Sequence, residues 1–387
     1  MMPDTASKRE ESKYRNRGLV LQLLATGECS SRIELSKRMN LSKMAVSNIV
    51  NDLIEKEVLI ETESDVNEMV GRNPVGLTIS EQAPKVVGLL IFRTRVEVVL
   101  CSLRLQILRR ESIVINNIQQ EELIQYIYEA RDMVMAGAEK CIGIGVASIG
   151  PVHVQKGMIL SPFYFYGIHD VKIVELLEER YGLPVFFDND NQCGVLAEKM
   201  FGDGKAYADI LLLGIAEGVG CGIITQNQLL GNKRGFDPEV GHISVDYRGN
   251  VCACGNRGCI ETYIRTPVML ENMRKATGKF YSYRKFCEIA EDNELVDQIF
   301  MDAMNNLAVA IVTVINILNS ELVLLGHDAC YWKEKYLREL EQRINQYKFG
   351  EKELRVKVRH TSFGKDSQLY GAACLVIQSV FEGCLQI

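Results

Sequence analysis

The sequence predicts an α/β body preceded by a small helical domain, on three observations. Short apolar runs alternate with amphipathic helical stretches over much of the chain after residue 85, which is the pattern of an α/β fold. The first eighty residues instead hold three short helical stretches followed by two strand-like runs. The chain has 387 residues, more than one core usually organises, so two or three domains are expected.

The composition is that of an ordinary soluble globular protein. Hydrophobic residues make up 47% of the chain and charged residues 24%, which excludes collagen-like, disordered and disulfide-rich classes. No run approaches the roughly 20 uninterrupted apolar residues of a membrane span, and residues 1–16 lack the apolar centre of a signal peptide. Most of the 12 cysteines stand singly in apolar contexts. We therefore expect a cytoplasmic protein that contacts no membrane.

Charge is distributed unevenly along the chain. Residues 1–50 carry nine basic and five acidic side chains, a net of +4, so the remainder carries −10 of the overall −6. A basic head on an acidic body fits an appended nucleic-acid-binding module. A charged, solvated face explains the same numbers equally well, so charge alone leaves both interpretations open.

The head is predicted to contain a helix-turn-helix followed by a hairpin. The apolar spacing indicates a first helix over 16–25, a second that follows Ser31 and a third that follows Ser42. Ser31 and Glu34 have the spacing of a capping box. The connection between the second and third helices is short, and strands at 58–60 and 77–79 flank a polar segment.

The third helix is the predicted recognition element, because it exposes small and hydrogen-bonding side chains suited to a major groove. An arginine in the polar hairpin could enter a minor groove. The candidate DNA contacts are Arg32, Ser42, Lys43, Met44, Ala45, Ser47, Asn48 and Arg72. The alternative is a three-helix bundle with a hairpin that contacts protein.

Four motifs of the head resemble the winged helix of ROK-family transcriptional repressors. They are N-x-x-x-V-L-x-L-L at 16–24, S-R-x-E-L at 31–35, L-S-K-M-A-V-S at 41–47 and G-R-x-P at 71–74. The resemblance implies an N-terminal winged helix-turn-helix domain that binds DNA.

A compact set of one imidazole and three thiols predicts a zinc site. His242, Cys252, Cys254 and Cys259 provide four ligands, which suit tetrahedral zinc with no open position and hence a structural metal. Glycines at 255 and 258 allow the tight turns that the cysteines need. Ordinary thiols are the alternative. The same spacing resembles the zinc signature of the ROK family, so the resemblance extends over the body.

The body is expected to contain strands and helices in alternation. Strands are predicted at 86–91, 96–103, 142–147, 185–187, 210–214, 221–225 and 322–325, and helices at 121–138, 172–181, 192–201 and 302–319. The resemblance implies that they form a two-lobed, actin-like fold of the sugar-kinase type. The predicted domains are 1–80 for the head, 81–200 for lobe 1, rejoined by a C-terminal helix over 368–387, and 201–367 for lobe 2 with the zinc loop.

The resemblance also implies a sugar site. Residues 188–191 read D-N-D-N and resemble a family segment that binds sugar hydroxyls through an amide and a carboxylate. The implied sugar-binding residues are Asn189, Asp190, Glu239, His242 and Glu261. His242 is assigned to both roles, and the metal is favoured. Carboxylates and an amide provide the acceptors and the donor that a polyhydroxylated ligand requires.

The phosphate site of the family's kinases is altered in this chain. Their D-x-G-G-T loop becomes a run in which Leu90 replaces the acid and Phe92 and Arg93 replace the glycines. A second departure is His327, in a position where the family has paired glycines. Phosphoryl transfer depends on positioning the nucleotide and metal, so no enzymatic activity is expected.

These observations together predict a sugar-responsive transcription factor, expected to repress genes of carbohydrate uptake and catabolism. The resemblance includes repressors that respond to xylose, N-acetylglucosamine or glucose. The expected partners are double-stranded operator DNA, a small sugar effector bound between the body lobes, and a second or further copies of the chain in a homodimer or tetramer. Two alternatives stay open: a ROK-type sugar kinase, and a scaffold that binds a transport-system protein without DNA.

Overall fold

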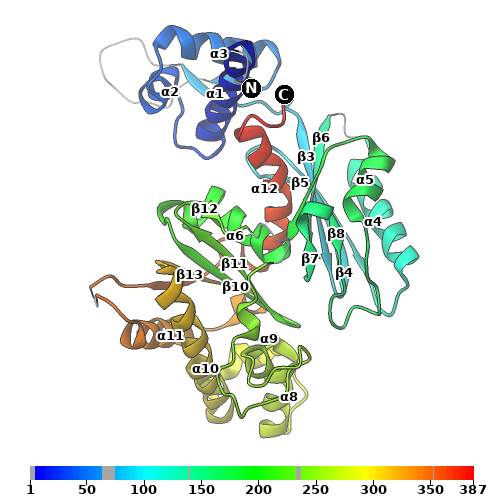
Figure 1. Ribbon diagram of the computed structural model, residues 1–387, viewed down its shortest axis with the longest axis vertical. Helices are drawn as coiled ribbons and strands as arrows, with labels where there is room; N and C mark the ends of the chain where they lie inside the picture. Colours follow the sequence, from blue (N-terminus) through cyan, green and yellow to red (C-terminus); the bar gives the residue numbers. More distant parts are fainter. Residues whose placement is uncertain (1–4, 63–74, 138–139, 232–236, 352) are drawn as a thin grey trace. The chain divides into compact units, whose positions relative to one another are not determined.

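The computed structural model describes residues 5–62, 75–137, 140–231, 237–351 and 353–387 (Figure 1). Contacts divide the chain into two compact units. Unit 1 comprises Met1–Ala147, Lys172–Phe187 and Ala372–Ile387, and unit 2 comprises Ser148–Val171 and Asp188–Gly371. The two units do not show which parts of the chain fold independently. The domain limits at 80, 200 and 367 therefore stay predictions.

The head of unit 1 contains α1 (Thr5–Ala25), α2 (Arg32–Met39) and α3 (Lys43–Glu55), followed by the antiparallel strands β1 (Leu59–Thr62) and β2 (Gly76–Ile79). Serine side chains cap α2 and α3, since Ser31 accepts from the N–H of Glu34 and Ser42 from that of Ala45. The predicted helices and strands are confirmed. Helix α1 begins eleven residues before the predicted start at residue 16, because its first turns are polar and show no apolar periodicity.

Unit 1 also holds a mixed sheet in the order β5-β4-β3-β6-β9. The strands are β3 (Lys85–Phe92), β4 (Arg95–Cys101), β5 (Ile107–Val114), β6 (Cys141–Ser148) and β9 (Val185–Asn189), and the helices of this part are α4 (Gln120–Met135), α5 (Ile173–Tyr181) and α12 (Ser367–Phe381). A Cβ on Gly145 of β6 would overlap the backbone carbonyl of Ala372, so glycine lets α12 pack directly on the sheet. Strand β5 was not predicted because it is an edge strand rich in charged residues.

Unit 2 is built on a second sheet in the order β12-β11-β10-β13-β14. Its strands are β10 (Ile210–Ile215), β11 (Val219–Thr225), β12 (Gln228–Leu229), β13 (Leu322–His327) and β14 (Lys357–His360), with the small pair β7 (Val152–His153) and β8 (Met158–Ile159) apart from it. Its helices are α6 (Asp190–Phe201), α7 (Glu261–Ile264), α8 (Thr266–Thr277), α9 (Tyr283–Ile289), α10 (Glu294–Leu318) and α11 (Glu334–Tyr347). Strands β10 and β11 form the predicted glycine-rich hairpin.

Helix α10 is the one helix of the described residues that is long and apolar enough to cross a membrane. Its buried side chains belong to the main core of unit 2, and the ring of Phe300 stacks on Tyr336 of α11 with centroids 4.4 Å apart. The length and apolar composition of α10 are therefore explained by its packing in the core of unit 2.

Candidate functional site

The four predicted zinc ligands lie on a folded loop of unit 2. His242 ends a short 3₁₀ turn over Val240–His242, and the chain returns through isolated β-bridges that pair Ser244 with Cys259 and Val251 with Arg257. Gly255 has φ +90° and Gly258 has φ +69°, a backbone region that favours glycine. These two turns bring the cysteines back to the histidine.

The ligand atoms of His242, Cys252, Cys254 and Cys259 all lie within 4.8 Å of one another. Cys252 Sγ is 3.6 Å from His242 Nδ1, and the Sγ atoms of Cys254 and Cys259 are 3.7 Å apart. A tetrahedron with Zn–S bonds of about 2.3 Å has edges of roughly 3.7 Å, so both separations fit four ligands around one ion. A hydrogen bond from the N–H of Asn256 lowers the pKa of Cys254, which favours the thiolate that a metal takes. The residues present therefore fit a structural zinc ion.

The metal cluster adjoins a carboxylate predicted to bind sugar. Glu261 Oε1 accepts a hydrogen bond from Cys252 Sγ at 3.1 Å and lies 3.7 Å from His242 Nδ1. Glu239 lies three residues before His242, within electrostatic range of His242, Glu261 and Asp190. The loop thus places two predicted sugar ligands beside the four metal ligands.

Asn189 and Asp190 lie where β9 ends and α6 begins, and both side chains are buried. Asn189 Oδ1 accepts from the N–H of Asn191 at 2.9 Å and so caps α6. Asp190 Oδ1 accepts from both the N–H and the side-chain amide of Asn191, each at 2.8 Å. These bonds fix the rotamers of the two predicted sugar ligands before any ligand arrives.

Two further carboxylates belong to the same cluster. Burial raises the pKa of Asp188 to about 6. Burial, and then the charges of Asp188, Glu239 and Asp190, raise the pKa of Asp237 to about 7. Asp237 was missed by sequence reasoning, although its position two residues before Glu239 was a usable signal. A cluster of perturbed carboxyl groups is typical of a functional site.

His327 lies at the end of β13 and faces the same cluster. Its Nε2 is 3.7 Å from Asp190 Oδ2, and both side chains are almost fully buried. The sequence identified His327 only as a departure from a glycine pair and gave no reason to expect it beside Asp190.

The segment predicted to correspond to the kinases' phosphate loop forms the end of β3, a tight turn and the start of β4. The side chains of Leu90 and Phe92 are buried, and Glu97 is buried between Arg95 and Arg110. The guanidinium of Arg95 also lies over the ring of Phe92, 5.1 Å from its centroid. Buried apolar and ion-paired side chains therefore stand at this end of the β3–β4 hairpin.

The predicted DNA contacts fall into three groups. Lys43, Met44 and Asn48 are exposed on α3, Ala45 and Ser47 are half-buried on the same helix, and Ser42 caps it. Arg32 donates to Glu61 at 2.5 Å and to Asn51 at 3.0 Å, so it holds α2 against α3 and β1. Arg72 lies outside the described residues. Asn51, which was not among the predicted contacts, is also exposed on α3 beyond Asn48.

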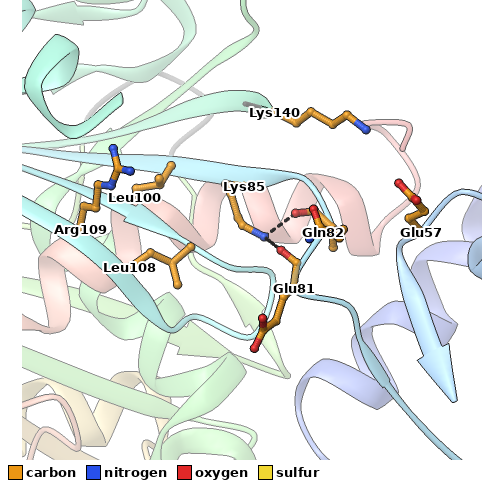
Figure 2. A pocket seen from close by; sticks show the side chains of 9 residues that line it. Glu57, Glu81, Gln82, Lys85, Leu100, Leu108, Arg109 and Lys140 are labelled. Atoms are coloured by element: carbon orange, nitrogen blue, oxygen red, sulfur yellow. Dashed lines mark hydrogen bonds between the residues drawn. The ribbon is translucent and has the colours of Figure 1, made fainter. Parts of the chain in front are cut away.

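A recess of about 360 Å³ lies elsewhere in unit 1 and is lined by Glu57, Glu81, Gln82, Ala83, Lys85, Leu100, Leu108, Arg109 and Lys140 (Figure 2). The ammonium of Lys85 donates to the backbone carbonyls of Glu81 and Ala83. Its donors are thus directed to the protein's own backbone. None of the predicted site residues lines this recess.

Known proteins resemble the chain over its body and, in some cases, over its whole length. The ROK family profile matches residues 86–379. The xylose repressor of Caldicellulosiruptor bescii is 24% identical over 391 residues, which cover 96% of this chain and 97% of the repressor. A solved ROK family transcriptional regulator, a homologue of the E. coli MLC protein, matches with a TM-score of 0.81 and 27% identity over 97% of this chain and 98% of its own.

The glucokinase of Thermotoga maritima is also similar, with 27% identity over 286 residues. These residues cover 70% of this chain and 89% of the kinase. The body shares its fold with solved ROK proteins, so the predicted α/β, actin-like body of the sugar-kinase type is confirmed. The chain belongs to the ROK family.

Proposed function

We propose that this chain is a sugar-responsive transcriptional repressor that binds operator DNA through its head and releases it when a sugar binds the body. One observation carries the proposal: similarity to a xylose repressor and to a ROK regulator covers 96% and 97% of the chain, head included. We propose that the chain controls genes for the uptake or breakdown of its effector sugar. The name of the similar repressor suggests xylose as that sugar.

DNA recognition is assigned to α3 of the head. Lys43, Ser47 and Asn48 lie along one side of α3, and Met44 and Ala45 complete the surface that would enter a major groove. Ser42 caps the helix. Arg32 is assigned to holding α3 in place, because its guanidinium already donates hydrogen bonds to Glu61 and Asn51. Arg72 is proposed as a minor-groove contact.

Sugar binding is assigned to the carboxylate cluster of unit 2. Asn189, Asp190, Glu239 and Glu261 are the proposed ligands, and Asp188 and Asp237 surround them. Carboxylates accept hydrogen bonds from sugar hydroxyls, and Asn189 adds an amide that both donates and accepts. His242 is assigned to the metal, beside Glu261.

Zinc is assigned to His242, Cys252, Cys254 and Cys259, with a structural role. The protein fills all four positions of a tetrahedral ion, so no open position is left for a substrate. The ion would hold the loop that carries Glu239 and Glu261.

A sugar kinase is the second candidate, favoured by Asp190 and by the similarity to a glucokinase. In this chain, however, Leu90 and Phe92 are buried where the kinases have an acid and a glycine, and Arg93 stands at the second glycine. A loop filled by apolar side chains offers neither backbone N–H groups to phosphate nor an oxygen to Mg²⁺. We therefore propose that the chain is not an enzyme.

The active form is proposed to be a homodimer or tetramer in the cytoplasm, because two heads related by symmetry read a pseudo-palindromic operator. A transport-system protein is a further proposed partner. Analytical ultracentrifugation of the protein with and without operator DNA measures the number of copies.

The test is a titration of purified protein against DNA from its own upstream region at fixed salt, repeated with D-xylose, D-glucose and N-acetyl-D-glucosamine. We expect specific binding that one sugar weakens at least tenfold, and no sugar-dependent hydrolysis of ATP. Sugar-dependent ATP turnover well above background would establish the kinase. Absence of specific DNA binding under every condition would favour the scaffold that binds protein.

A further inference from the structure

His327 occupies a backbone conformation that a histidine rarely adopts. Its φ is +54° and its ψ is −130°, a region that side chains with a Cβ normally avoid. The residue is the last of β13, directly opposite Ile215 of β10, and only 5% of it is exposed. Strained residues persist where the surroundings hold them and are concentrated at functional sites. The question is what this imidazole contributes in unit 2.

The ring of His327 lies near both Gly214 and Asp190. A Cβ on Gly214 would come within 2.7 Å of His327 Cδ2, so the glycine leaves the space that the ring occupies. Nε2, the ring atom bonded to Cδ2, is 3.7 Å from Asp190 Oδ2. The backbone of β13 and the absence of a side chain on β10 together direct the ring toward Asp190.

The two oxygens of Asp190 have different surroundings. Oδ1 accepts two hydrogen bonds from Asn191, whereas Oδ2 faces His327. A separation of 3.7 Å is too long for a good N–H···O hydrogen bond. It does allow one oxygen atom to lie roughly 2.7 to 3.0 Å from both Asp190 Oδ2 and His327 Nε2 at once.

We propose that Asp190 and His327 together hold one hydroxyl group of the effector sugar. The hydroxyl donates its proton to Asp190 Oδ2 and accepts a hydrogen bond from Nε2–H of His327, which uses both of its capacities. The proposal rests on the proposed function, in which Asp190 is a sugar ligand, and adds His327 as a residue that determines specificity.

The arrangement also defines the class of ligand. A phosphate at this hydroxyl would face Asp190 within a cluster that includes Asp188 and Asp237, so like charges would repel it. A sugar without the hydroxyl would lose both of these hydrogen bonds. The effector is therefore an unphosphorylated sugar with a free hydroxyl at this position.

The test compares His327→Gln with His327→Leu in the full-length protein. Both variants keep the same backbone strain, but only glutamine provides a side-chain N–H at a similar reach. Affinity for D-xylose, D-glucose and N-acetyl-D-glucosamine is measured by isothermal titration calorimetry. We expect leucine to raise the Kd of the bound sugar about tenfold or more and glutamine to keep it within about threefold.

A second measurement uses monodeoxy derivatives of the sugar that binds. The wild-type protein should bind one of them at least about tenfold more weakly than the parent sugar, and His327→Leu should lose that discrimination. His360→Leu, at the end of the neighbouring strand β14, serves as the matched control and should leave both affinities unchanged.

The outcomes separate the two proposals. If the wild-type protein binds none of the three sugars, the proposed function fails. If it binds one, and the leucine and glutamine variants match the wild type or weaken equally, His327 only fills space. The proposed function then stands without this inference.

Discussion

The β3–β4 hairpin of unit 1 and the β10–β11 hairpin of unit 2 are both antiparallel, but they differ in what packs on them. At the turn end of β3–β4, Leu90 and Phe92 are buried, so large apolar side chains stand at that end of the hairpin. In β10–β11, a Cβ on Gly214, Gly220 or Gly222 would overlap Asn191 of α6, so the space belongs to another element.

The difference shows how one backbone pattern supports two roles. Large side chains at the turn end of β3–β4 leave no glycine backbone there, and the proposed loss of phosphate binding in unit 1 follows from that. Glycines instead admit a polar residue from a neighbouring helix, and Asn191 then orients Asp190. The carboxylate cluster around Asp190 in unit 2 therefore depends on the absence of side chains at these glycines of β10 and β11.

The largest expected effect comes from filling the glycine hairpin. Gly222→Ala places a Cβ onto the backbone carbonyl of Asn191, which cannot move without displacing α6, so we expect the free energy of unfolding to fall by about 4 kcal/mol or more. Gly231→Ala, where a Cβ meets nothing within 4 Å, should change it by less than about 0.5 kcal/mol. Urea denaturation measures both, and equal stabilities would contradict the close packing.

Removing a large side chain from the β3–β4 hairpin should lower the free energy of unfolding by a smaller amount. Leu90→Ala removes a side chain that is 1% exposed and leaves a cavity in unit 1, which costs about 3 kcal/mol. Leu108→Ala on β5, where the side chain is 48% exposed, should cost less than about 1 kcal/mol. Differential scanning calorimetry measures both variants. A Leu90 variant as stable as the wild type would mean that the hairpin is not packed as described.

Removal of the metal tests the loop of unit 2 that carries His242 and the three cysteines. Cys252→Ala deletes one of four ligands, so we expect loss of one equivalent of zinc by mass spectrometry and a reduction in stability of about 2 kcal/mol. The effector response should be lost with the metal. Cys384→Ala, an exposed thiol outside the cluster, is the control. Normal sugar response in a zinc-free Cys252 variant would contradict a structural role for zinc.

The half-buried carboxyl of Asp237 should make stability depend on pH. Its pKa is about 7 in the folded protein and lower in the unfolded chain, so its contribution is fully present at low pH and is lost as pH rises toward 7. Stability should therefore rise by about 2 kcal/mol from pH 8 to pH 5, and Asp237→Asn should remove most of that rise. Glu217→Gln, an exposed carboxylate in the β10–β11 turn, should leave the pH profile unchanged. Chemical denaturation at several pH values measures the slopes.

The smallest effect on folding is expected in the head. Asn48→Ala removes an exposed amide from α3, so stability should change by less than about 0.5 kcal/mol while operator binding weakens by about 1 to 3 kcal/mol. Glu55→Ala, exposed at the far end of α3, should leave binding within about twofold. Fluorescence anisotropy at fixed salt measures both, and an unchanged Kd for Asn48→Ala would remove α3 from the proposed interface.

The sequence by itself located the helices of the head and the four candidate metal ligands. Apolar periodicity and serine caps located α2 and α3, because these signals lie within a few residues of the helix they define. His242 and the three cysteines fall within 18 consecutive positions, so glycine turns alone suffice to bring them together. Local spacing contains this information without any knowledge of the tertiary structure.

Only the tertiary structure decided which distant residues share the carboxylate cluster of unit 2. Asp190, Asp237 and His327 lie on three segments far apart in the chain, and no local pattern relates them. The pKa of Asp237 depends on burial and on charges that arrive from other elements, so it has no counterpart in the sequence. Likewise, His327 lies at the end of β13 beside Gly214 of β10, where a Cβ would come within 2.7 Å of its ring, and this neighbourhood exists only after the sheet has formed.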